Sequence, residues 1–374
     1  MKTIQHYCDA VVSRTTTMVM ERKSRRINRK IIVFESDDWG SIRMPSVEAR
    51  QFLLSKNIKI SSPNTYDKVD SLASNDDLRL LSEVLSSVKD GSGNPAKLTM
   101  NFIMANPDFN KIKEANFKTY YYEPFWETLN RYPNHDKSYE LLKEGIEKGV
   151  FQPQFHGREH LNVLKWLRLL QAGNSDMLLA FEKEMFSVKV EGERVLPAFN
   201  IENEGDASFI TRSIIEGLEM FESLFGFKSL SIIAPCYTWD NWVENTASEK
   251  GVRYIQGGFQ QKHSKIAPTR FSSHYLGQKN NNGQTYLTRN CLFEPSQDKK
   301  YDGNCCFKEI KQHLKRGIPA IVSCHRLNFI GALDEDNRTK NLEDFACLLK
   351  QIINEFPDVE FLSSDQLGLV LEDV

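Results

Sequence analysis

The feature that most constrains the fold is an apolar run near the N-terminus that ends in clustered acidic residues. Residues 31–34 are Ile-Ile-Val-Phe, and Glu35, Asp37 and Asp38 follow within four positions. Such a run predicts a strand that is buried on both faces. Carboxylates at the end of a buried strand need a metal ion or a cationic partner, and α/β proteins build their sites at such strand ends. The alternative is an acidic loop in which Asp38 caps the next helix.

Apolar segments alternate with amphipathic segments along the whole chain. We expect strands at 97–105, 150–155, 195–201, 228–234, 252–255, 285–293, 319–324 and 359–362, with helices between most of them. Repeated strand–helix units over this length favour a (β/α) barrel or a doubly wound parallel sheet. No internal repeat or low-complexity linker divides the chain. The sequence therefore predicts a lead-in over residues 1–29 and a single α/β domain over residues 30–374.

The composition excludes some classes of partner and membrane attachment. A net charge of −2 over 374 residues lacks the basic footprint that non-specific nucleic-acid binding needs. No apolar run approaches the roughly 20 residues of a transmembrane span, and the N-terminus lacks the apolar centre of a secretory signal. The seven cysteines, an odd number that includes the adjacent pair Cys305 and Cys306, favour reduced thiols. We therefore expect a cytoplasmic protein with no nucleic-acid partner and no transmembrane segment.

A pair of histidines follows the strand expected at 150–155. His156 and His160 stand four residues apart, where that strand is expected to run into the start of a helix. At this spacing both imidazoles can face one point, as they do in sites for divalent metals. A lone histidine is more often a hydrogen-bonded structural residue, but a pair after a buried strand favours a metal ligand set.

Two further expected strands end in residues that suit catalysis. After 228–234, the backbone amides of Cys236 or Tyr237 can form an oxyanion hole, and Trp239 can either stack on a sugar ring or pack in the core. After 319–324, His325 can serve as a general acid or base. Because parallel strands end at one rim, we expect His325 to emerge at the same rim as Asp38.

The order of these motifs resembles that of a known family. Asp37-Asp38, His156-x-x-x-His160, the Pro-aromatic turn that follows 228–234, and His325 resemble the motifs of the polysaccharide deacetylases (NodB homology, carbohydrate esterase 4). The resemblance spans residues 31–330 as short, scattered motifs. It implies a distorted (β/α) barrel with about seven strands, and metal-dependent removal of acyl (acetyl) groups from carbohydrate.

The resemblance also implies roles for individual residues. Asp37 corresponds to the catalytic base and His325 to the general acid, whereas Asp38, His156 and His160 correspond to the ligands of a divalent ion. Zinc is the ion expected, and a site of this kind also accepts cobalt, nickel or iron. A general acid near neutral pH needs a neighbouring carboxylate, which another strand end has to supply. The residues expected to contact the substrate or its oxyanion are Cys236, Tyr237, Trp39, Trp239, Arg158 and Arg326.

The chain departs from the family pattern at several points. Ile233 stands where the family has an arginine that orients the base, so we expect Arg158 or Arg326 to take that role. The family's Asp-containing fourth motif is not identifiable. The long separation of Asp38 from His156 indicates insertions at 57–76 and 109–135, which we expect to shape the substrate cleft.

Two other functions stay open at this stage. One is a carbohydrate-binding protein that keeps the metal site but has lost turnover, and the departure at Ile233 supports it. The other is a glycoside hydrolase that uses two carboxylates from among Asp37, Glu35 and Asp240. This second alternative leaves the histidine pair unexplained.

Overall fold

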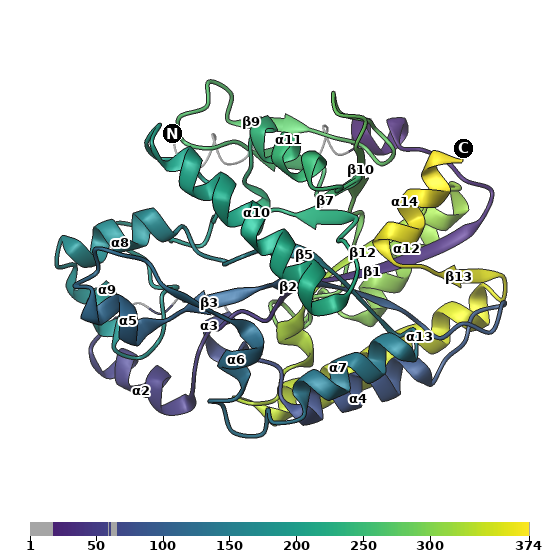
Figure 1. Cartoon of the computed structure of the whole chain (residues 1–374). Helices are drawn as coiled ribbons and strands as arrows, with labels where there is room; N and C mark the ends of the chain where they lie inside the picture. The colour runs from purple at the N-terminus through teal and green to yellow at the C-terminus, as the bar shows by residue number, and fades with distance from the viewer. Residues whose placement is uncertain (1–17, 59, 61–65, 374) are drawn as a thin grey trace, which may run out of the picture.

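A curled parallel sheet forms the centre of the molecule (Figure 1). The computed structural model describes residues 18–58, 60 and 66–373. Within them, nine strands form this sheet, and all of their pairings are parallel. The strand order is β10 (Thr285–Thr288), β7 (Tyr254–Gly257), β6 (Ser231–Ile233), β5 (Phe151–Gly157), β2 (Leu98–Ile103), β1 (Lys30–Trp39), β12 (Ala320–His325) and β11 (Cys291–Leu292), and β13 (Val359–Phe361) pairs with the start of β1.

The two edge strands of this sheet are consecutive in the chain. Only Arg289 and Asn290 join β10 to β11, so the facing ends of the two edges are at most about 11 Å apart. The sheet therefore curls until its edges nearly meet, although no ladder of hydrogen bonds joins β10 to β11 in the described sheet. This is the distorted (β/α) barrel that the sequence predicts, and that prediction is confirmed.

Helices cover the outside of the curled sheet (Figure 1). They are α2 (Val47–Ser55), α3 (Tyr66–Val69), α4 (Asn75–Ser86), α5 (Phe109–Glu114), α6 (Phe125–Leu129), α7 (Ser138–Glu147), α8 (Val163–Gln171), α9 (Ser175–Phe181), α10 (Asp206–Phe225), α11 (Asn241–Glu249), α12 (Gly303–Lys315), α13 (Glu335–Glu355) and α14 (Ser364–Glu372). Short 3₁₀ turns follow two strands, η1 (Pro235–Tyr237) and η2 (Arg326–Phe329). Two small antiparallel ribbons complete the fold, β3 (Ala105–Pro107) with β4 (Tyr122–Pro124), and β8 (Gln260–Lys262) with β9 (Phe271–Ser273).

The two faces of β1 pack into two different cores. Ile32 and Phe34 belong to the large hydrophobic cluster that the surrounding helices share. Ile31 and Val33 belong to a smaller cluster, to which α14 contributes Leu367. Helix α14 contacts β1, β7 and β10, so it spans the curled sheet at the end where these strands begin. The prediction that this strand is buried on both faces is confirmed, because residues 31–39 are all buried.

Some sequence-based expectations about elements are wrong. Residues 195–201 form no strand. Helix α8, between β5 and α9, was not predicted. The single strand expected over 285–293 is split into β10 and β11, which accounts in part for nine strands instead of about seven. The expected insertions contain their own elements: α3 lies within 57–76, and α5, β4 and α6 lie within 109–135.

The described part of the lead-in is attached to the barrel. Residues 18–23 are helical, and Ile27 is buried in the smaller core cluster. The backbone amide of Ile27 donates to the carbonyl of Gly317 (2.7 Å). The remainder of the expected lead-in, residues 1–17, lies outside the described residues, and the division into lead-in and domain stays a prediction.

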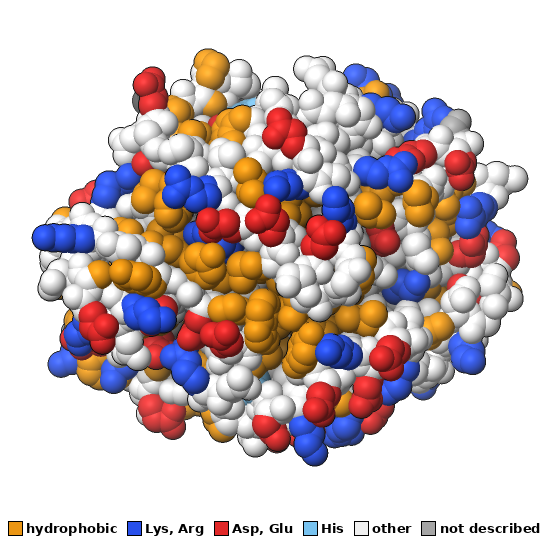
Figure 2. All heavy atoms as spheres, viewed as in Figure 1, with side chains coloured by type: hydrophobic (Ala, Val, Ile, Leu, Met, Phe, Trp, Pro, Cys, Tyr) orange, Lys and Arg blue, Asp and Glu red, His pale blue; other side chains and the backbone are white. Residues whose placement is uncertain are grey.

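The surface carries mixed charges. On the face shown in Figure 2, acidic and basic side chains alternate around a band of hydrophobic side chains, without an extended field of one sign. No helix in the described part of the chain combines the length and apolar character needed to cross a membrane.

Candidate active site

The interior face of β1 changes from apolar to charged along its length. Ile31 and Val33 lie in the small core cluster, and Glu35 and Asp37 follow on the same face because side chains alternate along a strand. The paired strand β12 repeats the order, since Ser323 lies opposite Glu35 and His325 lies opposite Asp37. Charged groups therefore gather inside the barrel at the carboxyl ends of its strands.

A β-bulge places the two neighbouring aspartates. In the pairing of β1 with β2, Ser36 faces Met100 and Trp39 faces Phe102, so β1 has one extra residue across this interval. Asp38 has a φ of 73°, a left-handed conformation that is uncommon for residues other than glycine. A bulge of this kind redirects a side chain, and here it brings Asp38 to the same end of the barrel as Asp37.

The strand that supplies the first histidine has a similar bulge. Phe102 faces Phe155, but Ile103 faces Gly157, which leaves His156 as the extra residue of β5. The chain between Gly157 and the start of α8 is not helical. The expectation that His160 lies at a helix start is therefore wrong, and an irregular turn brings it beside His156.

Asp38, His156 and His160 converge on one point. Nε2 of each histidine lies 3.3 Å from Oδ1 of Asp38, and all three residues are buried. Oδ1 of Asp38 has no hydrogen-bond partner among the described residues. One ligand atom from each residue lies within 4.8 Å of the others, a spacing that could hold a metal ion.

The protonation of the histidines fits a metal site. Nδ1 of His156 lies 2.8 Å from the carbonyl oxygen of Ile233, which can only accept, so Nδ1 carries the proton and Nε2 presents a lone pair. Burial lowers the pKa of His160 to about 4, although the neighbouring Asp38 opposes this shift. Two imidazole nitrogens and a carboxylate oxygen thus face each other, an arrangement that a divalent cation would stabilise.

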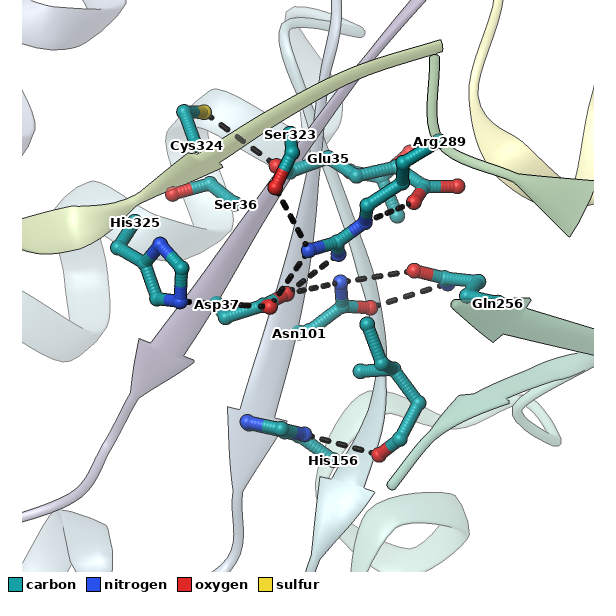
Figure 3. Close-up of polar contacts among 12 residues, drawn as sticks. Glu35, Ser36, Asp37, Asn101, His156, Gln256, Arg289, Ser323, Cys324 and His325 are labelled. Atoms are coloured by element: carbon teal, nitrogen blue, oxygen red, sulfur yellow. Dashed lines mark hydrogen bonds and ion pairs between the residues drawn. The ribbon is translucent and has the colours of Figure 1, made fainter. Parts of the chain in front are cut away.

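Arg289 binds the other aspartate at two points. Its Nη1 and Nη2 donate to the two carboxylate oxygens of Asp37 at 2.7 and 2.6 Å, and its Nε donates to Glu35 at 2.6 Å (Figure 3). Asn101 adds a bond of 2.8 Å to Oδ1 of Asp37. Burial raises the pKa of Asp37, but the Arg289 guanidinium outweighs burial and lowers it to about 2. Asp37 is therefore ionised and fixed in orientation.

His325 has the carboxylate neighbour that the sequence argument requires. Its Nδ1 hydrogen-bonds Glu294, a buried residue just after β11, and its Nε2 lies 3.8 Å from Asp37. Burial lowers the pKa of His325, but Glu294, Asp37 and Asp38 raise it to about 9. The ring of Tyr66 meets the His325 ring edge-on at 5.3 Å. His325 is thus a cation at neutral pH and emerges at the rim of Asp38.

The two tryptophans expected to contact substrate lie in the core. Trp39 is 1% exposed and donates to Ser36, and Trp239 is 2% exposed and donates to Glu244. Neither ring can stack on a sugar without exposing its packed surface. Of the two alternatives for Trp239, packing in the core is therefore the one observed, and Trp39 packs in the core as well.

Neither of the two expected arginines binds Asp37. Arg158 donates to Glu159 at 2.5 Å and lies over the ring of Tyr122 at 4.2 Å. Arg326 is fully buried and makes a two-point pair with Asp70 at 2.9 and 3.2 Å. The arginine that binds Asp37 is Arg289. No motif indicated it, because it lies within a stretch, 285–293, that resembled a continuous strand.

The turn after β6 was predicted to supply the amide of Cys236 or of Tyr237 to an oxyanion, and the structure contradicts this for Tyr237. Cys236 and Tyr237 both have left-handed φ angles, 56° and 52°. The amide of Tyr237 donates to the carbonyl of Ala234 at 3.0 Å, so it is not available to an oxyanion, and the prediction is wrong for this amide. The Tyr237 hydroxyl instead accepts from Arg289 at 3.1 Å. Burial raises the pKa of the Cys236 thiol to about 11, which makes it a poor nucleophile.

Replacing Arg289 by methionine is expected to lower the free energy of unfolding by about 3–5 kcal/mol. Glu35 and Asp37 would then be buried without their cation, and breaking a buried pair in this way is strongly destabilising. Arg289→Lys keeps the charge but cannot form the two-point pair. Compared with Arg289→Met, it should therefore restore much of the lost stability but little of the lost turnover. Urea unfolding and steady-state turnover measure the two effects.

Arg326→Met is the matched control for this experiment. It removes another buried arginine with a two-point carboxylate pair, so a comparable loss of stability is expected. Turnover per folded molecule should nevertheless stay close to that of the wild type. Equal losses of turnover in the two variants would contradict a specific role of Arg289 at Asp37.

Comparison with known proteins identifies the fold. No protein-family model matches the sequence, and no curated protein matches it. Among solved structures, the chain is similar to a candidate glycoside hydrolase/deacetylase of Parabacteroides distasonis, with a TM-score of 0.50 and 9% identity over 94% of this chain and 72% of the other. It is also similar to a candidate polysaccharide deacetylase of Pseudomonas aeruginosa, with a TM-score of 0.43 and 11% identity over 91% of this chain and 90% of the other. A candidate polysaccharide deacetylase of Mycobacterium smegmatis has a TM-score of 0.41 and 11% identity over 94% of this chain and 93% of the other.

The curled parallel sheet with helices outside it defines the class of the molecule as a distorted (β/α) barrel. More particularly, this barrel shares its fold with the candidate glycoside hydrolase/deacetylase of Parabacteroides distasonis. The fold that the motif resemblance implied is therefore confirmed.

Proposed function

We propose that the protein is a metal-dependent hydrolase that removes acyl groups, acetyl in particular, from a carbohydrate. The observation that supports this most strongly is the buried set of Asp38, His156 and His160 beside an oriented Asp37 and a protonated His325. Each of these five residues lies at or just beyond the carboxyl end of a barrel strand, where such folds carry their chemistry.

The donor set suits zinc, and it would also accept cobalt, nickel or iron. Asp38, His156 and His160 would hold the ion through one carboxylate oxygen and two imidazole nitrogens. Such an ion polarises an acyl carbonyl and activates a water molecule near neutral pH. The second nitrogen of His156 is already fixed by the Ile233 carbonyl, which orients its ring toward the site.

The remaining steps belong to side chains. Asp37 accepts the proton of the attacking water, and Arg289 and Asn101 keep its carboxylate oriented for that task. His325 gives a proton from Nε2 to the departing amine or alkoxide, because Nδ1 is held by Glu294. The acid and the base lie on paired residues of β12 and β1, which suits action on two sides of one acyl group.

The structure weakens both alternatives. The binding protein without turnover was supported by the missing arginine at Ile233, but Arg289 binds Asp37 from another strand end. A glycoside hydrolase would need a second carboxylate facing the sugar. Glu35 has no exposed surface and is bonded to Arg289 and Ser364, whereas Asp240 accepts from His263.

Removal of the metal tests the proposed function. Acetate release from a panel of N- and O-acetylated sugars should occur with the purified protein, fall to background after treatment with a chelator, and return when zinc is added. Metal content is measured in parallel by elemental analysis. Metal binding without acetate release from any acetylated sugar would favour the carbohydrate-binding alternative, and release that no chelator affects would contradict the metal.

A further inference from the structure

A buried arginine and a partly buried arginine share one carboxylate beside the candidate site. Nε of Arg43 lies 3.5 Å from Oδ1 of Asp67, and Nη2 of Arg194 lies 4.0 Å from Oδ2 of the same residue. The Arg43 side chain is 8% exposed, that of Arg194 is 16% exposed, and that of Asp67 is 1% exposed. Asp67 is also anchored by the hydroxyl of Ser187 at 2.6 Å.

The other nearby carboxylates already have partners. Asp70 makes its two-point pair with Arg326, and Asp38 belongs to the proposed ligand set. Two guanidinium groups therefore depend on one carboxylate, which leaves an excess positive charge in a nearly dry place. Nε of Arg43 and Nε of Arg194 are both buried without a hydrogen-bond partner in the described chain. Buried N–H donors without an acceptor are costly, and an anion that binds the two guanidinium groups would balance the second positive charge.

These arginines lie next to the residues of the proposed reaction. The guanidinium of Arg43 lies over the ring of Tyr66 at 4.9 Å, and the same ring meets the His325 ring edge-on at 5.3 Å. Burial is the main cause of the raised pKa of the Cys236 thiol, at the turn after β6, and Arg43, Asp38, Lys262 and Arg194 are among the charges close enough to act on it. Lys262 is exposed, so it adds a third cation at the rim.

We propose that Arg43 and Arg194 bind an acidic group of the substrate, a carboxylate or a phosphate, so that the substrate is an acidic acylated sugar. This inference rests on the proposed function for the position of the acyl group. The inference adds an anion subsite to the proposed function. Guanidinium groups bind both carboxylates and phosphates through paired N–H donors. A neutral acetylated sugar would leave the excess charge unpaired and would bind less tightly.

Equilibrium binding of three probes tests the subsite. N-acetylglucosamine is the neutral probe, N-acetylglucosaminuronic acid carries the carboxylate, and N-acetylglucosamine 6-phosphate carries the phosphate. Wild-type protein should bind at least one acidic probe about tenfold or more tightly than the neutral one, as expected for charge-assisted hydrogen bonds. Arg194→Gln should remove most of that preference, and Arg194→Lys should keep part of it. Arg194 is chosen because it is less buried than Arg43 and its replacement disturbs the fold less.

Arg212→Gln is the matched control, because Arg212 is exposed on α10, and it should keep the full preference. Equal affinity for neutral and acidic probes, or a preference that survives in Arg194→Gln, would overturn the inference. So would a lack of acidic binding up to about 10 mM, the weakest affinity that such a subsite should show. Binding of an acidic probe without acetate release would support the subsite and overturn the deacetylase assignment. Acetate release with equal kcat/KM for all three probes would support the deacetylase assignment and overturn the anion subsite.

Discussion

Replacing Asp38 by alanine is expected to remove the bound divalent ion and to lower turnover by at least about 10³-fold. Oδ1 of Asp38 is the point on which both Nε2 atoms converge, so its loss leaves two imidazoles and removes the one carboxylate of the proposed ligand set. A metal ion contributes several kcal/mol to the stabilisation of the transition state, and each 1.4 kcal/mol or so changes the rate tenfold. Elemental analysis of dialysed protein and acetate release measure the two effects.

Asp37→Asn separates the base from the ligand. This variant should keep its metal and lose turnover by about 10²–10⁴-fold, the usual contribution of a general base. Asp38→Asn serves as a second variant at the ligand position, because asparagine tolerates the left-handed φ of 73° better than alanine does. It should fold and still lose metal affinity. Equal metal loss in Asp37→Asn and Asp38→Asn would mean that the two roles are assigned wrongly.

The sequence carried enough information for the fold and for the rim at which the site residues gather. Apolar segments indicated parallel strands, and each of Asp38, His156 and His325 is one of the last two residues of its strand. Because parallel strands in a barrel end at one rim, their proximity followed from topology alone. The pairing of β1 with β12 then set Asp37 opposite His325, which a sequence pattern cannot specify.

The positions that sequence reasoning missed depend on irregular geometry. Two bulges, at Asp38 and His156, redirect side chains, and a bulge leaves no reliable mark in the sequence. Arg289 lies in the two-residue seam between β10 and β11, where the alternation of residues 285–293 indicated one strand. Trp39 and Trp239 were predicted to contact the substrate, although both pack in the core. The sequence does not distinguish an aromatic residue that packs in the core from one that faces solvent near a site.

Replacing His325 by alanine is expected to lower kcat by about 10²–10⁴-fold without changing the metal content. His325 is not one of the three proposed ligands, and its Nε2 faces Asp37 at 3.8 Å. The acid form must be present for the proton to be given, so the rate should fall as the pH rises through the pKa of His325. That pKa is about 9 in the protein without metal, and a bound divalent cation would lower it.

Glu294→Gln tests the origin of that pKa and therefore the role of His325. The Glu294 carboxylate raises the pKa of His325, so its removal lets burial dominate and lowers the pKa. The descending limb of the pH–rate profile should then move to lower pH, and Glu294→Asp, which keeps the charge, should move it much less. A merely structural His325 would give neither shift. An unchanged limb in Glu294→Gln, together with normal turnover in His325→Ala, would assign His325 to the packing of η2 and leave the general acid to another group.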